Sequence, residues 1–344
     1  LIAGALAVTA FAMTKLQTVT AYAVEGWMSQ GEEWRYLDEN DEPLQNTWKQ
    51  SRDSWFYLGG QGIMMRDCFI EQGNSLYYVF EDGARAENTW VLADEADEDG
   101  HEAGWYYFGA NGKAYRGTAS SFKRTVDGRS YIFDESGRML TGWFDEDGNQ
   151  LDEDDNPLEE GVYYADADGA LKTESWLDYS QLEIRGLEDL SSDISGRDYD
   201  EYDQVWLYFN NRSKKVKSNG GRLVQKNIDG STYGFDEYGI MLPWWTKVAS
   251  VSNADKSNPT SDVPAKFFAG YDGGSLLRNS WFWMYPSDNL IQDDSDDGEY
   301  SWWRTDQNGK IYQNKIKKVN DRYYAFDGLG RMQTGFVLFD TRRS

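Results

Sequence analysis

One short phrase recurs along almost the entire chain and constrains its fold more than any other feature. An aromatic-rich run is followed by polar residues and a glycine, and then by a short apolar tail. The cleanest copy is Trp105–Phe108 with Gly112. Eleven copies of the run can be read in the sequence: Trp34–Leu37, Trp55–Leu58, Leu76–Val79, Trp105–Phe108, Tyr131–Phe133, Val162–Ala165, Trp206–Phe209, Tyr233–Phe235, Phe267–Phe268, Trp302–Trp303 and Tyr324–Phe326. A unit that recurs at short intervals is typical of repeat architectures.

The parts of each copy are those of a β-hairpin. A short opening strand, as at Gly26–Trp27 or Asn46–Trp48, precedes a loop, the aromatic strand and a polar turn such as Asp134–Gly137. One hairpin alone is marginally stable in water, whereas hairpins stacked in tandem bury their rings against their neighbours. We therefore expect an all-β fold in which about eleven tandem β-hairpin repeats, in residues 24–344, stack as an elongated solenoid.

The composition favours small local cores over one large core. The chain holds 15 Trp and 23 Tyr, yet its mean hydropathy is −0.74. Disordered segments are poor in aromatic residues, so this polar chain is not expected to be disordered. The formal net charge of −25 argues against nucleic acid as a partner, because binding to phosphates requires a basic surface. The same charge either attracts cationic ligands or only keeps an aromatic-rich surface in solution.

The first residues are typical of the end of an export signal. The apolar run Leu1–Met13 precedes polar residues and the small-x-small sequence Ala21–Ala23, which predicts cleavage before Val24. No basic segment precedes the run, so residues 1–23 are interpreted as a truncated signal peptide and the protein as secreted. The run is too short to span a bilayer, and we expect no membrane span. An uncleaved anchor is the alternative interpretation.

The long loops inside the hairpins are acidic and are expected to be solvated. The acidic stretches are Asp94–Glu102, Asp145–Glu160, Glu188–Asp203 and Asp293–Glu299. The single histidine, His101, lies in the first of them and is expected to be solvated too. Two of these loops resemble the start of a Ca²⁺ loop but lack the glutamate at its twelfth position, so we expect no metal. Cys68 is the single cysteine, which excludes an internal disulfide, and we expect no cofactor.

Two segments carry a more specific pattern. Tyr131–Trp143 reads Tyr-Ile-Phe-Asp-Glu-Ser-Gly-Arg-Met-Leu-Thr-Gly-Trp, and Asp327–Phe336 repeats its second part. The pattern resembles the cell-wall-binding or choline-binding repeat of Gram-positive bacteria, over roughly residues 26–340. Related repeats bind glucans. The resemblance implies a β-hairpin solenoid that holds choline of teichoic acids in cages between consecutive hairpins, and it implies that two copies can form a homodimer.

The family pattern implies a composition for each cage. A cage takes the opening Trp and the first aromatic-strand Trp of one hairpin, with the second Tyr of the next hairpin as its third wall. Aromatic faces hold a quaternary ammonium by cation–π attraction. Because side chains alternate along a strand, residues one and three of the aromatic strand are assigned to the cage, and residues two and four to the core. The complete sets are then Trp27, Trp34 and Tyr57, and Trp48, Trp55 and Tyr78. Two-ring platforms remain at Trp90 with Trp105, Trp176 with Trp206, and Trp281 with Trp302.

These observations predict a non-catalytic binding module of the bacterial cell surface or cell wall. No stretch free of repeats is left for a catalytic domain, and neither a catalytic nor a zinc motif is present, so no catalytic residues are expected. The predicted partner is choline of cell-wall teichoic acid or a surface glycan. Two alternatives stay open. Flat Trp platforms also suit the sugar rings of glucans, or the repeats serve only as a structural or adhesive stalk that presents the acidic loops.

Overall fold

The computed structural model describes residues 26–118, 121–182, 205–219, 224–242, 245–246, 267–268, 273–284, 300–328 and 330–338. These residues form strands, turns and one turn of 3-10 helix, η1 (Tyr179–Gln181). No helix in this part of the chain is long and apolar enough to cross a membrane. The expected signal peptide and the acidic loops Glu188–Asp203 and Asp293–Glu299 lie outside the described residues. The chain divides into two compact units, Leu1–Tyr115 and Arg116–Ser344.

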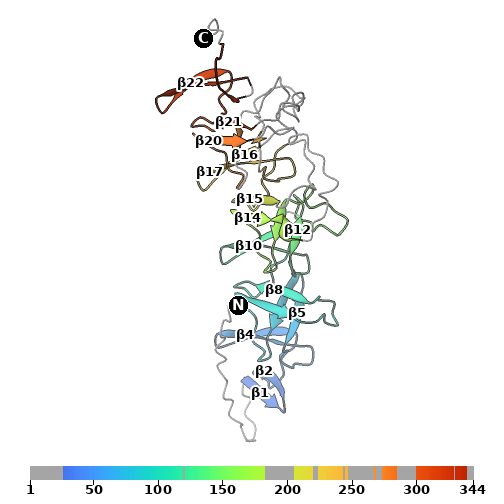
Figure 1. Ribbon diagram of the computed structural model, residues 1–344. Coiled ribbons are helices and arrows are strands. Elements are labelled where there is room, and N and C mark those ends of the chain that lie inside the picture. The colour runs from blue at the N-terminus through green and yellow to red at the C-terminus, as the bar shows by residue number, and fades with distance from the viewer. Residues whose placement is uncertain are drawn as a thin grey trace. The chain divides into compact units, whose positions relative to one another are not determined.

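The first unit contains antiparallel hairpins that follow one another in chain order (Figure 1). In each of them an opening strand pairs with the aromatic strand that comes next in the sequence. The pairs are β1 (Gly26–Gln30) with β2 (Glu33–Leu37), β3 (Thr47–Ser51) with β4 (Ser54–Leu58), β5 (Cys68–Gln72) with β6 (Ser75–Val79), and β7 (Thr89–Ala93) with β8 (Gly104–Phe108).

The second unit continues the same construction. Its pairs are β9 (Lys123–Val126) with β10 (Arg129–Phe133), β12 (Gly142–Phe144) with β13 (Tyr163–Ala165), β14 (Ser175–Asp178) with β15 (Trp206–Phe209), β16 (Val224–Ile228) with β17 (Ser231–Phe235), β18 (Trp245–Thr246) with β19 (Phe267–Phe268), β20 (Trp281–Met284) with β21 (Ser301–Arg304), and β22 (Lys315–Val319) with β23 (Arg322–Phe326). The short strands β11 (Met139–Leu140) and β24 (Met332–Gln333) add a third strand to two of them. Each copy of the sequence repeat coincides with one aromatic strand, so the all-β fold of tandem hairpins is confirmed.

A polar turn follows the aromatic strand and returns the chain alongside it. In the turn Asp134–Arg138, the Gly137 N–H donates to the Asp134 carbonyl at 3.1 Å. The Asp134 carboxylate accepts the Arg138 N–H at 2.9 Å. Gly137 has φ 100°, a region that glycine enters without the steric cost of a Cβ. The residue just after the turn, which pairs with the last residue of the aromatic strand, is called the bridge residue below.

Bridge residues also join consecutive hairpins. In six of them the N–H group donates to a carbonyl oxygen at or next to the start of the aromatic run of the hairpin before. The distances are 2.7–2.9 Å in the pairs Met64–Trp34, Arg85–Trp55, Ala114–Leu76, Leu171–Ser130, Lys215–Val162 and Met241–Trp206. This recurring hydrogen bond holds each of these bridge residues beside the start of the aromatic run in the hairpin before it.

The core is divided among neighbouring hairpins. Beyond the first hairpin, where Leu37 is half-buried, the last residue of the aromatic strand is buried as expected, and Phe108, Phe209 and Phe235 are each 0% exposed. Burial of a phenylalanine side chain contributes about 1.5–3 kcal/mol relative to leaving it exposed. The second residue of the strand is less uniform, because Tyr106 is fully buried whereas Phe56 is half-buried. A ring at this second position is therefore available for contacts outside the core.

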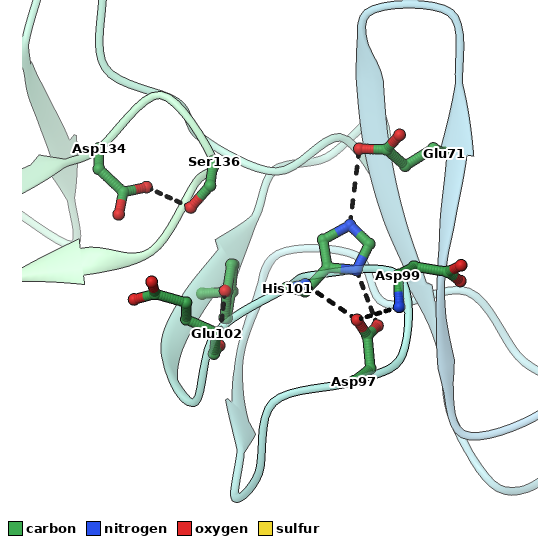
Figure 2. A network of polar contacts seen from close by, with 8 residues as sticks. Glu71, Asp97, Asp99, His101, Glu102, Asp134 and Ser136 are labelled. Atoms are coloured by element: carbon green, nitrogen blue, oxygen red, sulfur yellow. Dashed lines mark hydrogen bonds and ion pairs between the residues drawn. The ribbon is translucent and has the colours of Figure 1, made fainter.

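His101 is buried, which corrects the expectation that it is solvated, and its ring lies between the Asp97 and Glu71 carboxylates (Figure 2). Its ring stacks on Phe69 with the ring centres 4.6 Å apart. Its Nδ1 lies 2.7 Å from the Asp97 carboxylate, and its Nε2 lies 3.5 Å from the Glu71 carboxylate. Phe69 and Glu71 belong to β5, so the loop Asp94–Glu102 folds back onto the preceding hairpin. The rest of this loop is exposed, as its acidic composition predicts.

Candidate functional site

Each opening Trp whose contacts are described packs against the aromatic strand of its own hairpin. It is the cross-strand partner of the third residue of the aromatic strand, so both side chains lie on one face of the sheet. The ring centres are 5.1–5.3 Å apart in the pairs Trp27–Tyr36, Trp48–Tyr57, Trp90–Tyr107 and Trp176–Tyr208. The first residue of the aromatic strand, two positions earlier, shares this face. The opening Trp and the first aromatic residue are thereby brought to one side of each hairpin.

The ring that reaches an opening Trp from the next hairpin comes from the residue two before the buried last residue of the aromatic strand, which is the second of four positions when the last is counted as the fourth. The ring centres are 4.8–5.2 Å apart in the pairs Trp27–Phe56, Trp48–Tyr77, Trp176–Tyr233 and Trp281–Tyr324. The sequence analysis expected the third residue here. The difference has a physical cause: the third residue is already packed on the opening Trp of its own hairpin.

Tyr57 and Tyr78, the expected third walls, illustrate this displacement. Tyr57 contacts Trp48 within its own hairpin. Tyr78 contacts Phe69, with the ring centres 5.2 Å apart, and its hydroxyl donates to the Asp67 carboxylate at 2.5 Å. Burial and this hydrogen bond to a carboxylate raise the pKa of Tyr78. The ring contacts described for these two tyrosines are therefore not the ones that the sequence analysis gave them.

Trp27, Trp34 and Phe56 form the first site, with Met64 as its bridge residue. Trp27 and Phe56 meet edge to face at 5.2 Å, with their planes at 76°. Trp27 and Trp34 are half-buried. The Met64 N–H donates to the Trp34 carbonyl at 2.7 Å, and Met64 is only 7% exposed. The bridge residue of this site is therefore buried, apolar and uncharged.

A three-ring arrangement in the second unit is formed by Trp176, Trp206 and Tyr233. The Trp176 and Trp206 rings are perpendicular, at 87°, with centres 6.5 Å apart. Tyr233 closes a third side, 4.8 Å from Trp176 at 72°. The bridge residue Met241 packs in the same cluster, and its N–H donates to the Trp206 carbonyl. The sequence analysis had assigned only two rings to this site.

Trp281, Trp302 and Tyr324 repeat this arrangement further along the chain. Trp281 and Trp302 are again perpendicular, at 89° and 6.4 Å. Tyr324 lies 4.8 Å from Trp281. Trp302 is 42% exposed, so solvent reaches the site. The distance and the angle between the two Trp rings agree between these two sites to within 0.1 Å and 2°.

Trp90 and Trp105 form a two-ring site in the first unit. Their rings are perpendicular, at 86°, with centres 6.5 Å apart. Trp105 is 43% exposed. The strand register explains why the two rings meet as expected. Trp105 is the cross-strand partner of Leu92, which lies two residues after Trp90 and on the same face of the hairpin. The same Trp pair geometry thus occurs at all three of the expected two-ring platforms.

Two bridge positions carry cations instead of apolar residues. Arg85 lies against Trp48, Trp55 and Tyr77, which are the rings of a further site between the β3–β4 hairpin and the β5–β6 hairpin. Lys215 lies 5.6 Å from the Trp143 ring centre, and its Nζ donates to the carbonyls of Pro157 and Leu158 at 3.1 and 2.6 Å. Burial holds the pKa of Lys215 well below its usual value.

An exposed aromatic patch on one hairpin was missed by the sequence analysis. Trp283, Tyr300 and Trp302 are 51%, 57% and 42% exposed. Trp283 and Tyr300 are nearly parallel, at 18°, with centres 6.0 Å apart, and Trp283 lies 5.2 Å from Trp302. The two added residues lie outside the recurring repeat positions. Their signal in the sequence is only a local excess of rings around β20 and β21.

Known proteins provide a comparison for this arrangement. No protein-family model matches the chain. Over 110 residues the chain is 26% identical to glucosyltransferase-S of Streptococcus mutans serotype c, which covers 27% of this chain and 7% of that protein. A similar solved structure is the modular autolysin LytC of Streptococcus pneumoniae, with a TM-score of 0.46, 13% identity, and coverage of 90% of this chain and 53% of that chain. Another is the choline-binding domain of CbpL of Streptococcus pneumoniae, with a TM-score of 0.43, 20% identity, and coverage of 74% and 97%.

The chain resembles choline-binding repeat proteins. These similarities agree with the resemblance expected from the sequence. The chain spans about half the length of LytC and a small part of the glucosyltransferase.

Proposed function

We propose that the protein is a non-catalytic, secreted binding module of the bacterial cell surface that holds quaternary ammonium groups in aromatic cages between hairpins. Choline of cell-wall teichoic acid is the proposed ligand. The observation that carries the proposal is the three-ring set Trp176, Trp206 and Tyr233. Its rings are steeply inclined to one another, at 87° and 72°, so they present aromatic faces in more than one direction to a cation that has no hydrogen-bond donors.

Several sites share the proposed role. They are the three-ring sites Trp27, Trp34 and Phe56, Trp176, Trp206 and Tyr233, and Trp281, Trp302 and Tyr324, with the two-ring site Trp90 and Trp105. Weak sites repeated along one chain bind a polymer with many choline groups by avidity, without any strong single site. The net charge of −25 favours cationic over anionic ligands throughout.

Titration of the intrinsic tryptophan fluorescence of the full chain with choline tests this proposal. A cation–π contact contributes about 0.5–2 kcal/mol, so Trp206→Ala is expected to weaken choline binding at its site roughly 2–30-fold. Tyr233→Leu is expected to weaken it as well, whereas Tyr233→Phe retains the aromatic face and binding. Trp283→Ala is the control for this cage, because Trp283 is exposed and lies outside the set Trp176, Trp206 and Tyr233, although it contacts Trp302 of another proposed site. A folded protein with no saturable choline response contradicts the proposal and leaves the stalk as the account of the repeats.

A second candidate function is binding of a glucan on the exposed patch Trp283, Tyr300 and Trp302. Nearly parallel, exposed rings suit the flat apolar face of a sugar. The sequence similarity to a glucosyltransferase supports this candidate. Titration with glucan oligosaccharides separates the two functions: here Trp283→Ala is the variant that loses the response, and Trp206→Ala is the control that keeps it.

A further inference from the structure

The site formed by Trp48, Trp55 and Tyr77 is distinguished by a cation that faces all three of its rings, whereas at the Trp281 site the Arg304 guanidinium lies 5.3 Å from the Trp281 ring centre and has no described contact with the other two rings. The guanidinium carbon of Arg85 lies 5.2 Å from the centre of the Trp48 ring, 5.3 Å from that of Trp55 and 5.8 Å from that of Tyr77. All three distances are within the roughly 6 Å over which a cation is attracted to an aromatic face. One positive group therefore faces all three rings.

Arg85 is held in this position from several sides. Its backbone N–H donates to the Trp55 carbonyl at 2.8 Å, the hydrogen bond that Met64 and Met241 make in their hairpins. Its Nε and Nη2 donate to the same carboxylate oxygen of Glu87 at 3.0 and 2.5 Å. The backbone of Gly112 covers the side chain, since a Cβ there would lie 2.3 Å from the arginine Nε. The Arg85 side chain is only 12% exposed.

A quaternary ammonium ligand needs the same faces that Arg85 covers. To enter, it would have to displace a guanidinium that is tethered to the cage by its own backbone. It would also deprive the Glu87 carboxylate of the hydrogen bonds from Arg85. A tethered group acts at a high effective concentration, on the order of millimolar or more, so a weakly bound free cation competes poorly with it.

We propose that Arg85 is a resident cation of the Trp48, Trp55 and Tyr77 cage, and that it excludes cationic ligands from this site. The cage then fastens one hairpin to the next and takes no choline. Trp48 and Trp55 act here as packing partners of Arg85, and Tyr77, not Tyr78, is their third ring. The exclusion of ligand rests on the proposed function of the other cages, whereas the cation–π contact of Arg85 does not.

The repeat itself offers matched variants. Met64 and Met241 occupy the bridge position of Arg85 in two other three-ring sites. Arg85→Met therefore converts the resident-cation site into the apolar kind, and Met64→Arg is the reciprocal change beside Trp27, Trp34 and Phe56. The number of choline molecules bound at saturation is measured for both variants and the wild type by equilibrium dialysis of the full chain with radiolabelled choline.

Arg85→Met is expected to bind one more choline than the wild type, and the additional site is expected to be lost on Trp55→Ala. Met64→Arg is expected to bind one fewer. Wild-type binding is expected to be unaffected by Trp55→Ala. The proposal is overturned if Trp55→Ala removes a site from the wild type, or if folded Arg85→Met gains none while the other cages still bind choline.

A second measurement distinguishes failure of this proposal from failure of the proposed function. If no variant binds choline, the proposed function fails, and a thermal-unfolding double-mutant cycle of Arg85→Met with Trp55→Ala decides the remaining claim. A resident cation predicts that the two losses of stability are coupled. The unfolding equilibrium constant of the double variant is then expected to be at least fivefold smaller than the value that additive losses predict. Additive losses show that Arg85 and Trp55 do not interact and overturn the proposal.

Discussion

The backbone N–H of Arg85 donates to the carbonyl oxygen of Trp55, and the guanidinium of the same arginine lies 5.3 Å from the Trp55 ring centre. One residue thus holds the neighbouring hairpin through its backbone and covers its aromatic ring with its side chain. Met64 and Met241 make the same backbone contact with Trp34 and Trp206. The side chain at this one repeat position is therefore a cation in one hairpin and an uncharged methionine in two others.

Gly112 provides a test of the packing over Arg85. It has φ 72°, and a Cβ there would lie 2.3 Å from the arginine Nε. Gly112→Ala is expected to lose about 1–2 kcal/mol of unfolding free energy from the left-handed backbone, and at least about 1 kcal/mol more from the clash. Gly128→Ala is the control, because Gly128 has φ 79° with nothing within 4 Å of its Cβ position. Equal losses in chemical denaturation would show that Arg85 is free to move aside.

Phe235 tests the division of the core among hairpins. It is 0% exposed and stacks on Trp176, with ring centres 5.8 Å apart. Phe235→Ala is expected to reduce the unfolding free energy by about 3–5 kcal/mol, because it leaves a cavity beside the proposed cage. Tyr323→Ala serves as the control, since Tyr323 is 74% exposed and its loss is expected to stay within about 0.5 kcal/mol. A small loss for Phe235→Ala in urea unfolding contradicts this account of the core.

The hairpins could be predicted from the sequence because each one is a local structure. The phrase around Trp105–Phe108 contains its own strand, turn and glycine, and nothing distant is needed to specify it. His101 could not be placed in this way. Its burial depends on a loop that returns to Phe69 and Glu71 of another hairpin, and no local pattern encodes that return.

The candidate site could be predicted only in part for a related reason. The period of two along a strand correctly brings Trp176 and Trp206 to one face. It does not give the rotation between consecutive hairpins, and that rotation brings in Tyr233 at the second position of its strand. The side chain of Arg85 was missed because it follows the turn, where strand alternation no longer applies.

Cys68 is expected to react slowly with alkylating reagents in the folded protein. Burial, and to a lesser extent the nearby carboxylate of Asp67, raise the pKa of the Cys68 thiol to about 11. The thiolate is the reactive form, so the fraction available at pH 8 is about 100-fold smaller than for a thiol with a pKa of 9. Iodoacetamide labelling is expected to accelerate strongly in urea at constant pH, and in the folded protein its rate is expected to keep rising between pH 9 and 11. A native rate that reaches a plateau near pH 9 contradicts the shift.

Lys123 predicts a pH dependence of stability. Burial, and secondarily the charge of Lys214, lower the pKa of Lys123 to about 8, and its Nζ lies 3.7 Å from the Tyr163 ring centre. Between pH 8 and the ordinary lysine pKa the unfolded chain binds more protons than the folded one, so stability contributed by this group rises with pH. The unfolding free energy of the wild type minus that of Lys123→Met is therefore expected to increase from pH 8 to pH 10.5. A difference that is constant with pH contradicts the assignment.

A crystal structure of the full chain soaked with choline tests the central claim most directly. The account predicts a trimethylammonium group within about 6 Å of the ring centres of Trp176, Trp206 and Tyr233. It predicts a second at Trp281, Trp302 and Tyr324, and the Arg85 guanidinium in place of ligand between Trp48 and Trp55. Choline bound away from these rings and from the other proposed sites, or bound between Trp48 and Trp55 with Arg85 displaced, would contradict it.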